Sequence, residues 1–272
     1  MKYQITPEQT TYSERMGVIA PALGWAPPLR YLLRRARILS LLKKCRPPAT
    51  LLEIGCGAGA LLCDLTRIGY DVQGLETSVK ALSMATQLAN AAQSTHSVRA
   101  NPQPDWHGKF DIVCAFDVLE HIEDHDAALQ EWLQWLSPRG SLIISVPAHR
   151  SRWGAGDVWA GHWRRYDDSE LRELIAAHGL KIEYFECYGF PLANATEALG
   201  NIAYKRMLNK AESQSKGDAT ASSGVDRRSY LKLNRWINTL SGRAIISLAD
   251  GLQSLTKGRN WGSGYLVMAS RQ

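Results

Sequence analysis

A glycine-rich turn that follows an apolar run is the part of this sequence best suited to bind a nucleoside. Residues 50–54 are mostly apolar and lead directly into Gly55, Gly57 and Gly59. Glycines allow a tight turn and a close approach of the backbone to a ligand, and a helix that starts there offers N–H groups. Glu76 follows 21 positions after Gly55, where a carboxylate can accept hydrogen bonds from both hydroxyls of a ribose.

Glu53 is a charged residue inside the same apolar run. Burying a carboxylate costs free energy unless a partner is present. The position fits a site for a ligand that carries a cationic or amino group. It fits equally a structural carboxylate that accepts hydrogen bonds from N–H groups of the glycine-rich turn, so the residues alone leave both interpretations open.

Four histidines are candidates for proton transfer, because imidazole titrates near neutral pH. They are His121, His125, His149 and His162. His149 directly follows the apolar run 141–146, and the end of such a strand faces the ligand crevice in open α/β sheets. His121 lies just after another apolar run, where we expect it to shape a loop and a helix start rather than to catalyse.

Residues 150–166 combine three Trp, three Gly and four Arg. We expect no helix there, and aromatic walls with a few fixed polar groups suit a small-molecule pocket. We predict His162 as a base or an acceptor-orienting group, with His149 second and Asp157 orienting a histidine. Arg165 could hold an acidic group of a substrate or anchor the loop through a salt bridge. The alternative is that the whole segment is a packed structural loop.

Acidic and histidine side chains are concentrated between positions 117 and 126. Their spacing matches no ligand pattern that we recognise for a metal, and an acidic turn that caps a helix fits better. We therefore predict no metal site. The residues concerned are Asp117, Glu120, His121, Asp124, His125 and Asp126.

These side chains need a scaffold, and the sequence predicts an alternation of strands and helices. Such alternation is typical of a parallel, doubly wound α/β sheet with helices on both faces. We expect a turn at Ser137–Gly140 between a helix and a strand. The predicted strands are 50–54, 71–75, 97–100, 110–116, 141–146, 181–187 and 265–269, and the predicted helices are 29–44, 59–68, 79–92, 125–136 and 169–178.

The outer regions predict further helices at 190–210 and 229–256, joined by a polar, flexible linker at 211–229. Helix 29–44 and the second outer region are amphipathic and basic, which suits a lid, a dimer surface or a membrane contact; we favour a lid. The predicted organisation has three parts. They are an N-terminal helical cap (1–48), a core (49–189 with 259–272) and a helical insertion (190–258).

The composition limits the environment and the partners. The 272 residues carry a formal charge of +6, much of it in 30–46 and 227–243, and we expect a solvated basic face rather than a nucleic-acid surface. The five cysteines are odd in number and form no C-x-x-C pair, which argues for reduced thiols and a cytoplasmic location. No apolar run reaches the length of a membrane span.

Four segments in this order resemble the class I S-adenosylmethionine methyltransferases. They are LLEIGCGAG (51–59), GLE (74–76), FDIVCAFDVLEHI (110–122) and LSPRGSLIISVPA (136–148). The chain looks most like the small-molecule group related to the ubiquinone O-methyltransferases (methyltransferase type 11/12). The resemblance implies a Rossmann-like, seven-stranded, mostly parallel sheet with an antiparallel last strand, so 265–269 should pair beside 181–187. The helical lid elements are added to this core.

The resemblance also implies S-adenosyl-L-methionine as the cofactor and assigns residues to it. The glycines, with Glu53 and Cys56 beside them, would wrap the methionine part, and Glu76 would hold the ribose. Phe116 and Asp117 would contact the methionine end. Asn101 stands where relatives usually carry an acidic residue near the adenine amine.

A second family segment, W-G-x-x-D-x-x-x-x-H-x-R-R-Y, matches positions 153–166. The match covers Trp153, Gly154, Asp157, His162, Arg164, Arg165 and Tyr166. We take Trp153, Arg165 and Tyr166 as the candidates for contact with the substrate.

Methyl transfer is an in-line displacement at a sulfonium carbon, so the protein must mainly align the groups and exclude water. We expect O-methylation of a hydroxyl or phenol of a small molecule by a monomer or homodimer. The alternatives are N- or carboxyl methylation of a metabolite or peptide, a cofactor-binding regulatory protein without turnover, and an RNA methyltransferase. No RNA-binding module is evident, so we expect no nucleic acid partner.

Overall fold

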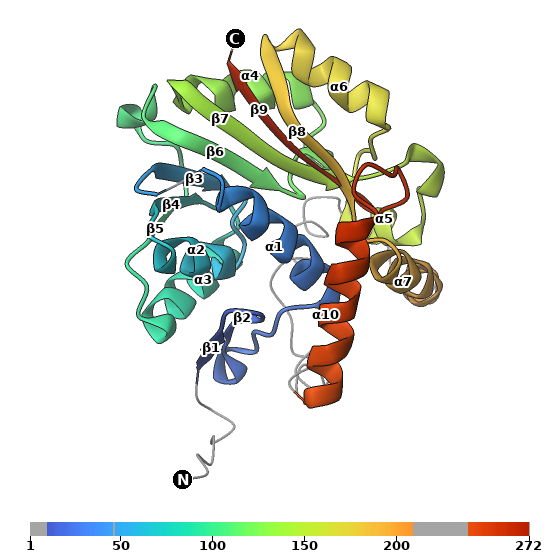
Figure 1. Cartoon of the computed structure of the whole chain (residues 1–272). Coiled ribbons are helices and arrows are strands. Elements are labelled where there is room, and N and C mark those ends of the chain that lie inside the picture. The colour runs from blue at the N-terminus through green and yellow to red at the C-terminus, as the bar shows by residue number, and fades with distance from the viewer. Residues whose placement is uncertain (1–9, 46, 209–238, 272) are drawn as a thin grey trace.

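A seven-stranded sheet forms the centre of the molecule (Figure 1). The computed structural model describes residues 10–45, 47–208 and 239–271. The strands follow the order β5-β4-β3-β6-β7-β9-β8, which confirms the predicted α/β fold. Their bounds are β3 (Thr50–Ile54), β4 (Asp71–Leu75), β5 (Ser97–Arg99), β6 (Phe110–Phe116), β7 (Leu136–Pro147), β8 (Leu180–Tyr188) and β9 (Gly264–Arg271).

The first five strands of the sheet run parallel, and β9 runs antiparallel to both of its neighbours. Tyr265 lies opposite Val146 on β7 and opposite Cys187 on β8. This arrangement confirms the predicted pairing of the last strand beside 181–187. It also places the last strand inside the sheet and leaves β8 at the edge.

Helices cover both faces of the sheet, which confirms that prediction (Figure 1). Helices α4 (His125–Trp135) and α6 (Asp168–Ala177) pack on one face, and α1 (Leu29–Leu42) and α2 (Ala60–Arg67) pack on the other. Strand β3 contributes to both cores, since Leu52 and Ile54 belong to the first and Leu51 to the second. Side chains alternate along a strand, so Glu53 lies on the face that α1 covers.

Helices α3 (Val79–Ala92) and α4 each begin after a residue whose side chain caps the helix. Helix α3 begins after Ser78, whose side chain accepts a hydrogen bond from the Ala81 N–H. Helix α4 begins after Asp124, which caps it in the same way. The predicted helix-capping role of the acidic turn is therefore confirmed for Asp124.

The N-terminal region differs from the predicted helical cap. It begins with a two-stranded antiparallel sheet of β1 (Thr11–Ser13) and β2 (Gly17–Ile19), followed by a short turn of helix, η1 (Pro21–Leu23). Among residues 10–45, which the structure describes, α1 is the only α-helix. Val18 and Ala20 are two positions apart and both pack into the core with α2 and α3, as side chains on one face of a strand do.

The expectation of a solvated basic face is wrong for two arginines of α1, although Arg30 at its start is exposed. Arg35 and Arg37 are only 2% and 4% exposed. Arg35 pairs with Asp64 on α2, and Arg37 pairs with Glu186 on β8. The carboxylates opposite them make burial of the guanidinium groups possible, so these arginines join α1 to the sheet and to its neighbours.

Three further elements lie outside the parallel core. Helix α5 (Ala155–Ala160) lies inside the segment expected to hold no helix, and α7 (Leu192–Leu208) packs against it. Helix α10 (Leu240–Leu255) packs on α1. The predicted linker at 211–229 lies outside the described residues. Within the described residues, no helix is long and apolar enough to cross a membrane.

The predicted turn at Ser137–Gly140 is also wrong, because β7 begins at Leu136 and runs through it. Leu136 pairs with Phe110 before a shift in register, and regular pairing resumes between Ser141 and Ile112. Pro138 and Gly140 therefore lie in a distorted strand end rather than in a turn. The residues Pro138, Arg139 and Gly140 are compatible with a turn and with a distorted strand end, so the sequence alone does not distinguish the two.

Candidate active site

The glycine-rich turn joins β3 to α2 and forms an open backbone cradle. Gly55, Gly57 and Gly59 have φ values of +63°, +56° and +70°, a region that favours glycine. A Cβ at Gly55 would lie 2.6 Å from Val118, whereas a Cβ at Gly57 would meet nothing within 4 Å. The turn therefore needs glycine at its start for packing and leaves space for a ligand at Gly57.

Glu76 follows β4 and is bonded to both sides of this cradle. Its Oε2 accepts a hydrogen bond of 2.8 Å from the Gly57 N–H, and its Oε1 accepts one of 2.8 Å from the Ser78 N–H. Each oxygen keeps a further lone pair. The carboxylate is therefore held in one orientation while it can still accept hydrogen bonds from a ligand, as the ribose role requires.

Glu53 is buried beside the cradle without full hydrogen bonding. It is 5% exposed, and its Oε2 has no hydrogen-bond partner among the described residues. Burial raises the pKa of Glu53 to about 8, against the opposing effect of Arg34. The turn's N–H groups at Gly55, Cys56 and Gly57 donate to Leu75 and Glu76 instead. The geometry therefore favours a ligand-binding carboxylate over a structural acceptor.

Asp117 follows β6 in a left-handed conformation, with φ of +55°. It accepts a hydrogen bond of 3.0 Å from the Ser145 hydroxyl and pairs with Arg34 of α1. Burial acts to raise the pKa of Asp117, but Arg34 and Arg30 hold it below the ordinary value. Arg34 was not among the site residues predicted from the sequence. Its only signal was a helix with arginines on more than one side.

The remaining residues assigned to the cofactor lie around the same edge of the sheet. Phe116 is buried at the end of β6, and Cys56 is buried within the turn. Asn101 is exposed two positions after β5. The Glu76 N–H donates to the Arg99 carbonyl at the end of that strand, so Asn101 follows the strand next to Glu76.

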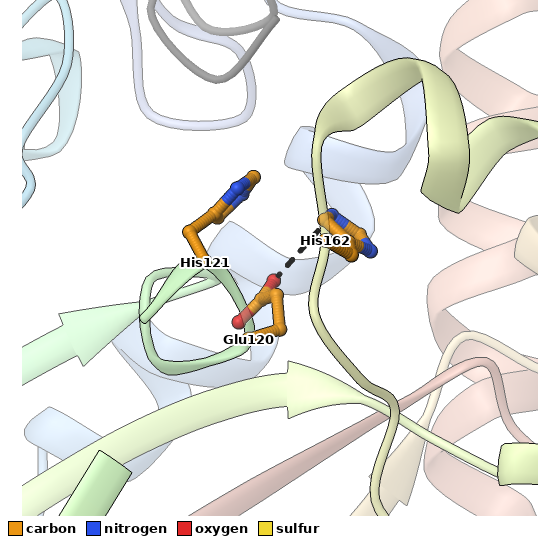
Figure 2. Close-up of side chains that lie close together, drawn as sticks. All are labelled: Glu120, His121 and His162. Carbon is orange, nitrogen blue, oxygen red and sulfur yellow. Dashed lines mark ion pairs between the residues drawn. The ribbon is translucent and has the colours of Figure 1, made fainter. Parts of the chain in front are cut away.

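A second group of side chains gathers past the end of β6. Figure 2 shows Glu120 and His121, from the short helical turn η3 (Leu119–His121), facing His162 from the loop after α5. Glu120 Oε1 lies 4.0 Å from His162 Nε2, and the rings of His121 and His162 meet edge to face with centroids 4.6 Å apart. The Trp163 N–H donates to the Glu120 carbonyl over 2.7 Å, which fixes the loop against η3.

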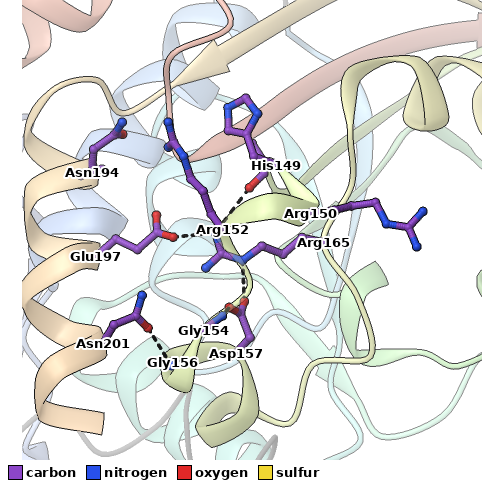
Figure 3. A network of polar contacts seen from close by, with 12 residues as sticks. His149, Arg150, Arg152, Gly154, Gly156, Asp157, Arg165, Asn194, Glu197 and Asn201 are labelled. Atoms are coloured by element: carbon purple, nitrogen blue, oxygen red, sulfur yellow. Dashed lines mark hydrogen bonds and ion pairs between the residues drawn. The ribbon is translucent and has the colours of Figure 1, made fainter. Parts of the chain in front are cut away.

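The same segment carries a network of polar contacts that includes Asp157 and Arg165 (Figure 3). Asp157 Oδ1 lies 2.9 Å from His162 Nδ1 and accepts a hydrogen bond of 2.8 Å from Arg165 Nε. Arg165 also pairs with Glu197 of α7 at 2.5 Å. Burial acts to raise the pKa of Asp157, but hydrogen bonds from His162 and Arg165 lower it to about 2. A charged Asp157 favours the tautomer with the proton on His162 Nδ1.

The other predicted substrate and catalytic residues have different surroundings in the structure. His149 contacts Cys187 and Tyr265, with its Nε2 3.8 Å from the thiol, rather than His162. Tyr166 is fully buried, and its hydroxyl lies 2.9 Å from His125 Nδ1. Trp153 is 43% exposed. The predicted His162–Asp157 contact is present, and Arg165 forms the salt bridges of the anchoring alternative.

Comparison with known proteins identifies the family of this chain. The family model described as methyltransferase domain matches residues 29–184. The ubiquinone biosynthesis O-methyltransferase of Bradyrhizobium sp. (strain ORS 278) is 33% identical over 115 residues, which are 42% of this chain and 44% of that protein. The enzyme of the same name from Rhodopseudomonas palustris (strain TIE-1) is 32% identical over 116 residues, with the same coverage. The chain thus matches less than half the length of these curated relatives.

Solved structures share the fold. The [4+2]-cyclase SpnF aligns with a TM-score of 0.59 and 16% identity, over 96% of this chain and 87% of that one. A putative sarcosine dimethylglycine methyltransferase from Galdieria sulphuraria aligns with a TM-score of 0.57 and 13% identity, over 98% and 94%. At such identities the likeness concerns the fold alone. The family match, which spans the cradle and Glu76, shows that this chain belongs to the methyltransferase domain family.

Proposed function

We propose that this chain transfers the methyl group of S-adenosylmethionine to a hydroxyl or phenol oxygen of a small molecule. The observation that carries the proposal is the position of His162, whose Nδ1 is held by Asp157 while its Nε2 lies 4.0 Å from Glu120 in η3, the turn of helix that comes after β6. The curated relatives, which are named O-methyltransferases, support oxygen as the acceptor atom.

The cradle supplies contacts that fit each part of the cofactor. The unpaired oxygen of Glu53 suits the ammonium of the methionine part, and Arg34 beside Asp117 suits its carboxylate. Glu76 accepts hydrogen bonds from the ribose hydroxyls, and the side-chain oxygen of the exposed Asn101 accepts one from the adenine amine. When bound, the cofactor supplies an electrophilic methyl group whose leaving sulfur becomes neutral.

The acceptor binds beside His162 in this proposal. The Nε2 atom of His162 orients the acceptor oxygen and takes its proton, and the charged Asp157 stabilises the imidazolium that results. The exposed indole of Trp153 offers an apolar wall. Arg165 and Tyr166 contribute by fixing the loop, because both are buried and bonded to protein groups.

A single substitution tests the role of His162. We expect His162→Ala to lower turnover about 100-fold or more, the usual contribution of a positioned acid or base, and to leave cofactor affinity unchanged. The control is His107→Ala, at an exposed position outside the site. Single-turnover assays with labelled cofactor against phenols, carboxylic acids, amines and peptides identify the acceptor class. Full activity of His162→Ala would remove the base, and transfer only to amines or carboxylates would contradict O-methylation.

A further inference from the structure

We propose that Glu120, His121 and His162 form a binding site for one divalent transition-metal ion. One ligand atom from each of the three residues lies within 4.8 Å of the other two. Figure 2 shows the three side chains close together, on two separate segments of the chain. Two imidazoles and one carboxylate are ligands that suit Zn²⁺, Fe²⁺, Co²⁺ or Mn²⁺ better than Mg²⁺ or Ca²⁺, which prefer oxygen.

Glu120 is the strongest indication of a missing cation. Its side chain is fully buried, and neither carboxylate oxygen has a hydrogen-bond partner among the described residues. An unsatisfied buried carboxylate is costly. Arg34 lies near enough to act on it electrostatically but pairs directly with Asp117. A cation between Glu120 and the two imidazoles supplies the missing partner.

Asp157 gives His162 the orientation of a metal ligand. Histidines that bind metals usually donate their other ring N–H to a carboxylate, which fixes the tautomer and the ring orientation. His162 has this arrangement, because Nδ1 lies 2.9 Å from Asp157 and Nε2 faces Glu120. Asp157 in turn accepts hydrogen bonds from Arg165 and from the Gly154 N–H. It therefore supports the ligand rather than acting as one.

The backbone holds the two ligand-bearing segments together independently of any ion. Glu120 and His121 are adjacent in η3, directly after the turn that follows β6. The hydrogen bond from the Trp163 N–H to the Glu120 carbonyl attaches the loop of His162 to that turn. A site held in place by backbone contacts requires only small side-chain movements to bring three donors to bonding distance.

Three protein ligands leave coordination positions for water or for an oxygen of the acceptor. This consequence rests on the proposed function, whereas binding of the ion does not. In the metal-bound protein Nε2 of His162 would be a ligand, so the base of the proposed function applies to the metal-free protein, and the proton of a metal-bound acceptor hydroxyl would pass to solvent water. A metal also lowers the pKa of a bound hydroxyl group.

Metal titration of untagged, chelator-treated full-length protein tests the site. We expect Co²⁺ and Zn²⁺ to bind with a stoichiometry of one in calorimetry, and bound Co²⁺ to give visible absorption bands with nitrogen ligation. Glu120→Gln keeps the shape of the side chain and removes the charge. We expect this variant and His162→Ala to weaken binding at least 100-fold, and Asp157→Asn to weaken it about 10- to 100-fold as a loss of orienting support.

His178→Ala is the matched control, because His178 bonds to backbone carbonyls away from the site. Circular dichroism establishes that each variant is folded. No stoichiometric binding to the wild type, or binding unchanged by both Glu120→Gln and His162→Ala, would overturn the metal site. That result would leave the proposed function standing if labelled methyl transfer persists. Stoichiometric binding with no transfer to any oxygen acceptor would support the metal site and overturn the proposed function.

Discussion

Glu53, Glu120 and Asp157 are all buried carboxylates, but their pKa values shift in different directions. Burial raises the pKa of Glu53 to about 8 and that of Glu120 well above its ordinary value. Asp157 is also buried, yet its pKa is lowered to about 2 by hydrogen bonds from His162 and Arg165. Hydrogen-bond donors held in place by the fold decide whether the pKa of a buried carboxylate falls or rises. The carboxylates that lack them are the ones suited to a cationic ligand.

Glu53 should make the cofactor-free protein less stable at higher pH. Its folded pKa of about 8 exceeds the ordinary value of 4.5, so its stabilising contribution is complete below about pH 4.5 and is lost as the pH rises toward 8. We expect Glu53→Gln, which does not titrate, to lose less stability between pH 5 and pH 8, by up to roughly 4 kcal/mol. Urea unfolding at both pH values measures this. Equal losses in the two proteins would contradict the prediction.

Glu76→Ala should weaken cofactor binding without unfolding the sheet. The variant loses two ribose contacts and the hydrogen bonds to Gly57 and Ser78. Because a hydrogen bond to a charged group contributes about 1.5–3 kcal/mol, we expect affinity to fall about 10- to 100-fold or more in calorimetry. Asp71→Ala, at the exposed start of the same strand, is the control. Unchanged affinity of Glu76→Ala would remove the ribose role.

Sequence reasoning found the residues whose roles depend on a local pattern. Gly57 and Glu76 follow strands, and Asp157 and His162 lie close in sequence. Arg34 could not be found in this way, since its partner Asp117 is distant along the chain. The prediction of no metal considered only ligands between 117 and 126. It did not include His162, which the fold brings to Glu120.

At the scale of elements, α7 packs against Leu33 of α1 through Ala193 and docks on the segment of His162 through a polar stripe. Its four contact residues recur at intervals of three and four, so they share one side of the helix. They reach the Trp261 carbonyl, Arg165, the Gly156 N–H and the ring of Trp159 (Figure 3 shows the first three of the four residues). The four are Asn194, Glu197, Asn201 and Tyr204. Helix α7 thereby supports the segment that carries His162.

Breaking this contact should destabilise the protein more than breaking a surface pair. Glu197→Ala leaves the buried Arg165 with one carboxylate instead of two, and we expect a loss of about 2–4 kcal/mol. Glu183→Ala removes an exposed pair with Lys181 and should cost less than about 1 kcal/mol. Chemical unfolding compares them. Equal effects of the two substitutions would show that α7 is not held through Arg165.

The regular elements followed from hydrophobic periodicity, and the exceptions have physical reasons. Strand β6 is an apolar run of ordinary length, and the first half of β8 alternates apolar and charged residues. Helix α5 was missed because it has six residues and buries only the polar Asp157. The start of β7 was missed because a register shift accommodates Pro138 and Gly140. Periodicity does not reveal structure that polar contacts or irregular pairing define.

At the scale of the whole molecule, α1 joins parts that are far apart in sequence. Arg37 bonds to Glu186 of β8 and to Ser254 of α10 (Figure 1), while Arg34 reaches the cofactor edge through Asp117. The insertion and the cradle are therefore connected by one helix. Changes at either end of α1 can affect the other through rigid, buried contacts.

We expect bound cofactor to raise the thermal stability of the whole domain. A ligand present at 100 times its dissociation constant stabilises the native state by about 2.7 kcal/mol, which corresponds to a rise in Tm of roughly 5–10 °C for a domain of this size. We expect that rise with S-adenosylmethionine in differential scanning fluorimetry. Glu76→Ala should show a smaller rise at the same concentration. No rise in the wild type, at a concentration that saturates binding in calorimetry, would contradict coupling between the cradle and the fold.

The position of β9 has a consequence for how the protein is made. Because β9 lies between β7 and β8, a ribosome that has released residues up to β8 has produced a sheet with one strand still missing from its interior. Both neighbouring strands then present unpaired backbone groups, which favour association with other chains. Assembly of the sheet must therefore wait until residues 264–271 have left the exit tunnel, although the cradle and the parallel strands are translated much earlier.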